Sequence, residues 1–298
     1  MHPDRPETLV TLEPGLRRVL APNPSHMTYW GTNSYILGEG RVAVLDPGPA
    51  NPEHLDALLG ALAPGETVSH ILVTHTHNDH SPLSRPLAEA TGAPVYAFGN
   101  SLAGRSDVMK RLASEGLTGG GEGIDLEFAP DEILADGDVV SGQDWAVKAL
   151  WTPGHIGNHL CFVWGDAVFS GDHVMGWAPS LVSPPDGDLT AFMASTERLA
   201  NRRDRVFYSG HGAPIEDPAA RTRWLLDHRR SRENAIVDAL SQGHSTLAAL
   251  TSVVYADTPK NMHPAASRNL FSHLIDLIEQ SRVTAEPQIA PGAEFRLI

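Results

Sequence analysis

A cluster of metal-binding side chains at residues 75–80 constrains this chain more than any other feature of its sequence. The cluster consists of His75, His77, Asp79 and His80. It directly follows an apolar run, residues 71–73, which is typical of a short buried strand. Imidazole and carboxylate groups bind zinc, manganese, iron and cobalt. A core strand that ends in four such groups therefore predicts a metal site.

The spacing of these side chains favours two ions over one. In an extended segment, residues two apart point to the same side, so His75, His77 and Asp79 share one side of the loop. His80 points in a different direction. One small ion cannot easily take all four groups from so short a stretch, whereas two ions can. The alternative is a solvated His-rich loop, since the chain has 15 His among 298 residues. The position at a strand end favours the metal site.

Three further strand ends each supply one more ligand-type side chain. In each, an apolar run is followed by a turn of small residues and then by one histidine or aspartate. They are His155 after residues 149–151, Asp172 after residues 167–169 and His211 after residues 205–208. Glycines in the turns let the backbone bend sharply and approach an ion closely. Together with the cluster, these residues are enough for a two-metal site.

The pattern His-x-His-x-Asp-His, followed by a lone His, a lone Asp and a lone His, resembles the metallo-β-lactamase superfamily. The strand and turn at residues 44–48 (VLDPG) also match the early aspartate of that family, here Asp46. The resemblance covers roughly residues 15–215. It implies an α+β fold, a four-layer αββα sandwich with the metals at one edge of the two sheets.

The resemblance assigns the seven ligand positions to two metals. His75, His77 and His155 would hold the first metal. Asp79, His80 and His211 would hold the second, and Asp172 would bridge both. Relatives with a carboxylate at the second His position are di-iron electron-transfer proteins, and His77 separates this chain from them.

The resemblance also implies hydrolysis by a metal-bound hydroxide. Two ions about 3.5–4 Å apart lower the pKa of a bridging water and polarise the bond that is cleaved. We expect two zinc ions per chain, with manganese or iron as alternatives. Asp79 and Asp172 are the expected catalytic residues. Asp79 orients the nucleophile and passes its proton, and Asp172 holds the ions at a fixed separation. Asp46 is expected to lie behind the metal ligands and to orient the loop of residues 75–80, which we call the His loop.

The chain departs from the family pattern directly after His80. Relatives commonly have glycines there, whereas this chain has Ser81 and Pro82. Serine is a good helix N-cap and proline is favoured as the first helical residue. We therefore expect a helix over residues 82–91 with Ser81 as its N-cap and its positive end near the site.

After Pro218 strand patterns give way to helical periods. Apolar residues recur at helical spacing in residues 224–240, 247–255 and 263–278. Residues 283–298 are expected to form a two-stranded wing. This order resembles the accessory domain of the β-lactamase-like protein 2 group. It implies a catalytic domain over residues 1–218 and a small, mostly helical, winged-helix-like domain over residues 219–298.

Charge restricts the class of substrate. The net charge of −14 disfavours binding to polyanions. Residues 198–232 nevertheless carry nine Arg against four acidic residues. A solvated helix face is the preferred interpretation of this Arg cluster, and a guide for an anionic substrate is the alternative. We expect a small thioester or ester substrate, with cleavage of single-stranded RNA as the alternative.

Two other classes of function stay open. Persulfide dioxygenases share much of the His loop but use one iron, so metal analysis separates them from a dinuclear hydrolase. A nucleic-acid-binding regulator that acts through the C-terminal helices is disfavoured, because few basic residues follow residue 232.

Composition also bears on location and partners. No apolar run approaches the length of a membrane span, the first residues lack a secretion-signal pattern, and Cys161 is the only cysteine. We expect a cytoplasmic protein with a small-molecule substrate and no membrane partner. RNA is the less favoured partner, and the oligomeric state stays open.

A few smaller expectations surround the site. Residues 116–123 contain five Gly and predict a mobile loop, either a lid over the metals or a surface insertion. Three residues before the first strand, His26, Thr28 and Tyr29, are expected to line the pocket. His159 is expected behind the ligands, and the side chain of His173 is expected to point away. Surface or ordinary packing positions are expected for His2, His54, His70, His228, His244 and His273.

Overall fold

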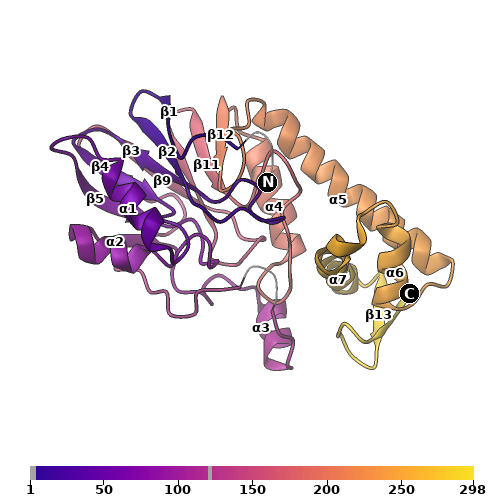
Figure 1. Ribbon diagram of the computed structural model, residues 1–298. Helices are drawn as coiled ribbons and strands as arrows, with labels where there is room; N and C mark the ends of the chain where they lie inside the picture. The colour runs from indigo at the N-terminus through magenta and orange to yellow at the C-terminus, as the bar shows by residue number, and fades with distance from the viewer. Residues whose placement is uncertain (1–4, 120–122) are drawn as a thin grey trace.

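The structure is a computed structural model that describes residues 5–119 and 123–298. Two β-sheets lie face to face, and helices cover their outer faces (Figure 1). This is the αββα arrangement of an α+β protein that the sequence predicted. A helical unit with a small hairpin follows at the C-terminal end of the chain.

The first sheet has seven strands in the order β1-β2-β3-β4-β5-β6-β7. They are β1 (Leu9–Glu13), β2 (Leu16–Leu20), β3 (Asn33–Leu37), β4 (Arg41–Leu45), β5 (Thr67–Leu72), β6 (Val95–Ala97) and β7 (Glu132–Ile133). Pairing is antiparallel from β1 to β4 and parallel from β4 to β7. Because strand side chains alternate, Val42 and Val44 of β4 face the outer helices while Ala43 and Leu45 face the other sheet.

The second sheet has five strands in the order β12-β11-β10-β9-β8. They are β8 (Val139–Ser141), β9 (Ala146–Trp151), β10 (Leu160–Trp164), β11 (Ala167–Gly171) and β12 (Val206–Ser209). Pairing is antiparallel except between β11 and β12, which are parallel. As a result β9, β11 and β12 all run in the same direction and end at the same edge.

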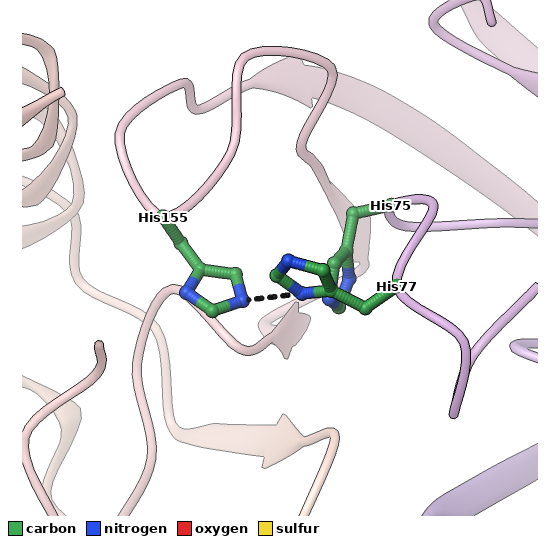
Figure 2. Close-up of side chains that lie close together, drawn as sticks. All are labelled: His75, His77 and His155. Carbon is green, nitrogen blue, oxygen red and sulfur yellow. Dashed lines mark hydrogen bonds between the residues drawn. The ribbon is translucent and has the colours of Figure 1, made fainter. Parts of the chain in front are cut away.

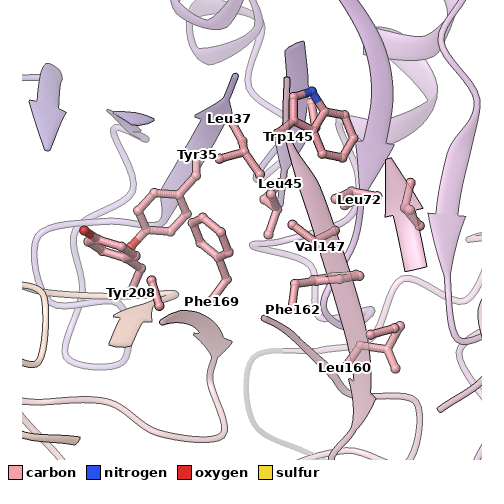
Figure 3. Packing of buried hydrophobic residues seen from close by; sticks show 14 of the residues in the cluster. Tyr35, Leu37, Leu45, Leu72, Trp145, Val147, Leu160, Phe162, Phe169 and Tyr208 are labelled. Carbon is pink, nitrogen blue, oxygen red and sulfur yellow. The ribbon is translucent and has the colours of Figure 1, made fainter. Parts of the chain in front are cut away.

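The main apolar core lies between the two sheets (Figure 3). Leu45 and Leu72 of the first sheet share this core with Val147 and Phe162 of the second, and all four are at most 1% exposed. Burial of each such side chain contributes about 1.5–3 kcal/mol. The core therefore holds the two sheets in a fixed relation, and with them the shared edge where the predicted ligands lie.

Two pairs of helices form the outer layers. They are α1 (Pro52–Gly60) and α2 (Ser84–Thr91) on the first sheet, and α4 (Leu189–Ala200) and α5 (Pro218–Ser241) on the second. Leu58 and Leu87 anchor the first pair in a buried cluster with β4 and β5. Leu199 and Leu225 anchor the second pair against β10, β11 and β12.

The C-terminal unit matches the predicted order of helices and wing. It contains α6 (Leu247–Val254), the 3-10 helix η1 (Lys260–Met262), α7 (His263–Glu279), β13 (Val283–Glu286) and β14 (Glu294–Leu297). Thr246 caps α6, because its side chain accepts a hydrogen bond from the Ala249 N–H. The two strands pair antiparallel and form the wing.

Helix α5 joins the two parts of the molecule (Figure 1). Its Leu225 belongs to the core beneath the second sheet, whereas its Ile236 belongs to the C-terminal core. The C-terminal core also includes Met109 and Leu112 of α3 (Asp107–Ser114), which precedes residue 218 in the chain. A domain division at residue 218 stays a prediction, because α5 and α3 contribute to the packing across it.

The helix after the His loop begins later than the sequence predicted. Helix α2 starts at Ser84 and its N-cap position is Leu83, so the prediction of Ser81 as N-cap and Pro82 as first residue is wrong. The Ser81 hydroxyl instead donates a hydrogen bond to Asp125 Oδ2 at 2.9 Å. A serine used in this way stabilises the turn after His80 and leaves the helix without a side-chain cap.

The Gly-rich segment lies beside the His loop. The Asn78 N–H donates to the Gly123 carbonyl, and Gly119 lies against the Asp186 carboxylate. The rest of the predicted loop, residues 120–122, lies outside the described residues, so the lid stays a prediction. Within the described ranges, no helix is both long and apolar enough to span a membrane.

Candidate metal centre

Four strands deliver the predicted ligands to one edge of the sandwich. The His loop follows β5, His155 follows β9, Asp172 follows β11 and His211 follows β12. Because these strands run toward the same edge, their following loops meet there. The structure brings all seven predicted residues together in two groups, His75, His77 and His155, and Asp79, His80, Asp172 and His211.

The first group consists of three buried imidazoles (Figure 2). One candidate ligand atom from each lies within 4.8 Å of the others, and His155 Nε2 is 2.9 Å from His77 Nδ1. The other nitrogen of His155, Nδ1, is 2.7 Å from the Leu181 carbonyl oxygen. This contact makes Nδ1 the protonated donor and leaves the Nε2 lone pair facing His77.

The second group combines two imidazoles with two carboxylates. His211 Nε2 lies 3.1 Å from Asp79 Oδ2 and 3.2 Å from Asp172 Oδ2. His80 Nε2 lies 3.4 Å from Asp172 Oδ1. Asp172 also reaches the first group, because its Oδ2 is 3.9 Å from His155 Nε2. Asp172 is thus the carboxylate that stands between the two groups.

Burial governs protonation in the first group. It lowers the pKa of His75 well below its usual value, lowers the pKa of His77 to about 3 and also lowers the pKa of His155. All three imidazoles are therefore neutral at pH 7. A neutral imidazole is the form that binds a metal ion.

Charge pairing governs the second group. Burial by itself lowers the pKa of His211, but the Asp172 and Asp79 carboxylates together outweigh it and raise that pKa to about 10. Burial likewise opposes protonation of His80, yet Asp79 and Asp172 raise its pKa well above the usual value. Two protons thus offset the charge of two buried carboxylates. A divalent cation that replaces these two protons can bind only after His80 and His211 have released them.

The residues fit metal ions on chemical grounds. His75 Nε2 and Asp79 Oδ1 are buried and make no hydrogen bond to the described residues. Buried polar atoms are normally paired, so these two point to a partner of another kind. Five imidazoles and two carboxylates form a nitrogen and oxygen donor set that suits zinc, and also manganese or iron.

Asp46 stands behind the ligands, as the sequence predicted. Its Oδ1 accepts from the Thr74 N–H at 2.7 Å, and its Oδ2 lies 2.9 Å from His80 Nδ1. The Thr74 hydroxyl donates to Asp46 Oδ2 and also lies 2.9 Å from His75 Nδ1. Asp46 therefore orients two of the imidazoles. His211 is oriented separately by the Gly31 carbonyl, 3.1 Å from its Nδ1.

Two further histidines lie behind the first group. The rings of His159 and His75 are 5.2 Å apart, and His159 Nδ1 lies 2.9 Å from the Thr152 hydroxyl. His173 is directed away from the ligands, because its Nε2 lies 3.0 Å from the Thr196 hydroxyl on α4. Both arrangements match the expectations for these residues.

A cleft of about 270 Å³ opens between the two groups of ligands and the C-terminal unit. His155 and Asp172 line one side, and residues of α5, η1 and α7 line the other, including Arg232 and Met262. A larger hollow of about 510 Å³ lies between α3, α7 and the wing, but no predicted metal ligand lines it. Of these two hollows, the smaller cleft is the one that candidate metal ligands line.

Only part of the predicted pocket lining lies in this cleft. His26 lines it together with Met27. Thr28 is instead buried and donates to the Asn23 carbonyl at 2.5 Å, so its predicted place in the pocket is wrong. Tyr29 stacks on Trp177 beside the cleft, with ring centroids 5.0 Å apart.

Sequence reasoning missed the far wall of the cleft. It consists of His228, Arg232, Tyr255, Thr258, Met262, Ala265, Ala266 and Asn269. Nothing in the local pattern of these residues marks a site. They come to line the same cleft as His155 and Asp172 only because the C-terminal unit packs against the sandwich. The change of pattern after Pro218 was the one available signal.

The Arg cluster of residues 198–232 is largely engaged within the protein. Arg198 pairs with Asp136, Arg202 with Asp204, Arg205 with Glu13 and Asp166, and Arg230 with Glu197. Arg229 is 1% exposed and donates to the Ser180 carbonyl and to Asn269. Arg202 and Arg205 lie outside the helices, so the cluster is not the single solvated helix face that was the preferred interpretation. With four of its nine arginines ion-paired and a fifth buried, it is not an open track for a polyanion either.

Comparison with known proteins agrees with the fold and the site. Residues 27–211 match the Metallo-beta-lactamase superfamily, and residues 246–290 match the Beta-lactamase associated winged helix domain. The chain is 31% identical to the Beta-lactamase-like protein 2 homolog of Drosophila melanogaster, over 89% of this chain and 88% of that protein. It is 30% identical to the Atrochrysone carboxyl ACP thioesterase of Claviceps purpurea (strain 20.1), over 83% of this chain and 74% of that protein.

A solved structure is similar over the whole molecule. The crystal structure of a metallo-beta-lactamase family protein from Thermus thermophilus has a TM-score of 0.75 and 25% identity, and the match covers 97% of this chain and 100% of that one. The chain therefore belongs to the metallo-β-lactamase superfamily. Within it, the chain is similar to the β-lactamase-like protein 2 group and is a metal-dependent hydrolase with an associated winged helix, as predicted.

Proposed function

We propose that this hydrolase holds two divalent ions, zinc by preference, and cleaves small thioesters or related esters. The observation that carries the proposal is the pair of adjacent ligand groups with Asp172 between them. Their seven residues offer nitrogen and oxygen donors, and two of them, His155 and Asp172, line the cleft. When bound, two such ions supply a hydrolytic nucleophile at neutral pH and polarise the carbonyl of the substrate.

The chain's own residues divide the remaining work. Asp172, with its side chain 1% exposed, is placed to hold the two ion positions at a fixed separation. Asp79 has the more exposed side chain of the two aspartates, 10% against 1%. Its Oδ1 makes no hydrogen bond to the described residues. Asp79 is therefore the group that orients the attacking water and carries its proton away.

The walls of the cleft support an acyl substrate. Met27, Met175, Trp177 and Met262 make much of its surface apolar, which favours a carbon chain or ring over a sugar-phosphate backbone. A relative of this chain is named an acyl carrier protein thioesterase, which supports the same class of bond. The internal pairing of the Arg cluster speaks against single-stranded RNA as the preferred substrate.

A substrate panel tests the proposal. The metal-loaded protein is offered an N-acetylcysteamine thioester, the matching oxygen ester and a single-stranded RNA. We expect turnover of the thioester, abolished by a chelator and restored by zinc. Cleavage of the RNA without thioester turnover would establish the nuclease instead. Consumption of oxygen with a persulfide, at about one iron per chain, would establish the dioxygenase.

An aspartate variant tests the role of Asp79. Asp79→Asn is expected to lower kcat by about 10²-fold or more, because an amide cannot accept a proton from the attacking water. Asp56→Asn, on the exposed face of α1, is the matched control and is expected to keep wild-type activity. Equal activity in the two variants would remove Asp79 from the mechanism.

A further inference from the structure

The cleft contains one permanently charged group that pairs with no carboxylate among the described residues. Arg232 of α5 lines the cleft opposite His155 and Asp172. It is partly buried, and its Nη1 donates to the Val254 carbonyl at 2.6 Å. Its guanidinium also lies over the Tyr255 ring, 4.8 Å from the centroid. These two contacts hold the guanidinium in place and leave its other N–H donors for a ligand.

The arginines beside Arg232 on the same helix are used differently. Arg229 is buried and donates to the Ser180 carbonyl and to Asn269. Arg230 points outward and pairs with Glu197 at 2.9 Å. Arg232 is thus distinguished from both, since it faces the cleft and no acid within residues 5–119 and 123–298 pairs with it.

Arg232 is the permanently positive side chain among the residues that line the cleft. Burial and the nearby Arg229 and Arg232 lower the pKa of His228 to about 4, so this imidazole is neutral at pH 7. His26 is exposed at the mouth of the cleft. Asp172 is the one carboxylate among the lining residues, and it lies in the candidate metal centre.

We propose that Arg232 forms an anion-binding subsite at the C-terminal wall of the cleft, which selects thioester substrates with a negatively charged group away from the scissile bond. This inference rests on the proposed function. A planar guanidinium beside an apolar wall suits a carboxylate on the acyl chain. A phosphate on the pantetheine arm of an acyl carrier offers the same chemistry from the other side of the thioester.

Binding measurements test the subsite without turnover. The probes are uncleaved amide analogues of two five-carbon N-acetylcysteamine thioesters, glutaryl with a terminal carboxylate and pentanoyl without one. A second pair compares pentanoyl pantetheine amide with its 4′-phosphorylated form. Calorimetry on the metal-loaded protein is expected to show tighter binding of the charged member in at least one pair, by about 10- to 100-fold, the range of a charge-assisted hydrogen bond.

Variants connect the preference to Arg232. Arg232→Gln is expected to remove the preference, and Arg232→Lys to keep part of it. Arg230→Gln, on the outer face of the same helix, is the matched control and is expected to leave it unchanged. The pair that responds identifies the source of the anion, acyl carboxylate or carrier phosphate. A preference that survives in Arg232→Gln, or no preference in either pair, would overturn the inference.

Turnover of the parent thioesters separates this inference from the proposed function. Hydrolysis of charged and uncharged thioesters at equal kcat/KM would retain the thioesterase and remove the Arg232 subsite. Binding that depends on Arg232, without hydrolysis of any thioester, would retain the anion subsite and remove the thioesterase.

Discussion

At the scale of single residues, Asp46 has the largest role outside the ligand set. It adopts a positive φ of 46°, a conformation that aspartate and asparagine tolerate better than most residues. From that position its two oxygens meet the Thr74 N–H, the Thr74 hydroxyl and His80 Nδ1. One carboxylate therefore fixes the loop that carries four of the candidate ligands.

Asp46→Asn tests this role with little change of shape. The amide cannot accept from all three donors, so His80 loses part of its orientation. We expect metal affinity to fall by about 10- to 100-fold. The measurement is competition with a chromophoric chelator. Asp144→Asn, at a surface turn, is the control, and equal affinity in the two variants would show that Asp46 does not orient the ligands.

His54 makes the stability of the fold depend on pH. Burial lowers the pKa of His54 to about 4, whereas an unfolded chain has a histidine pKa of about 6.5. The unfolded state therefore binds the extra proton first as pH falls. The contribution of neutral His54 is fully present above pH 6.5 and is lost progressively between about pH 6.5 and 4.

His54→Gln is expected to reduce the loss of stability on acidification. Between pH 7 and pH 5 the wild type should lose about 2 kcal/mol more than the variant in free energy of unfolding. Denaturant titrations at the two pH values, both with excess chelator, give this difference. The other buried histidines cancel because both proteins contain them. Equal losses in the two proteins would show that His54 titrates normally.

At the scale of elements, the candidate ligands were predictable because each one follows its own strand and turn. The pattern of apolar run, small residues and ligand is local, and the structure places His155, Asp172 and His211 at such strand ends. The start of α2 was not predictable in this way. Ser81 is a good cap by type, but its hydroxyl bonds to Asp125, a residue 44 positions along the chain.

The turn before His211 allows almost no added volume. A Cβ on Gly210 would lie 2.2 Å from Asp172 Oδ1 and 2.7 Å from His80 Cε1. Gly210→Ala is therefore expected to displace Asp172, release at least one ion and lower activity by about 10²-fold, the cost of misplacing reacting groups by about 1 Å. Gly60→Ala, where a Cβ meets nothing within 4 Å, is the control and should retain metal and activity.

Elemental analysis of the two glycine variants checks this expectation. Circular dichroism shows in parallel whether the fold is kept. Full metal content and activity in Gly210→Ala would mean that the turn can shift to accept a methyl group. The close approach of Gly210 to Asp172 and His80 would then not be required for the site.

At the scale of the whole molecule, the C-terminal unit reaches the first group of ligands through one hydrogen-bond chain. Asn269 of α7 accepts from the Val182 N–H at 2.9 Å and from Arg229 at 3.0 Å. The preceding carbonyl, that of Leu181, accepts from His155 Nδ1. The winged-helix unit therefore helps to orient a candidate metal ligand besides forming a wall of the cleft.

Asn269→Ala tests this connection between the two units. It leaves the Val182 N–H without its acceptor, so the loop that orients His155 is expected to shift. Metal affinity should fall by about 10-fold or more at one of the two ion positions. Asn234→Ala, exposed on α5, is the control. Chelator competition that finds both ions bound as tightly as in the wild type would contradict the connection.

These contacts between units could not be predicted from sequence. The order of C-terminal helices follows from local periods, the αββα sandwich was implied by the resemblance of the ligand pattern to a known family, and both were predicted correctly. The packing of Met109 and Leu112 of α3 into the C-terminal core joins segments more than a hundred residues apart. The far wall of the cleft, including Arg232, depends on that packing, and no local pattern marks it.

Metal content per chain tests the dinuclear assignment most directly. The protein is purified without added chelator, desalted and analysed for zinc, manganese and iron against its concentration from amino-acid analysis. We expect close to two divalent ions per chain, predominantly zinc, falling to one or none in Asp172→Ala with the fold retained. A single ion per chain in the wild type, unchanged when zinc is supplied in excess, would contradict the two-ion site.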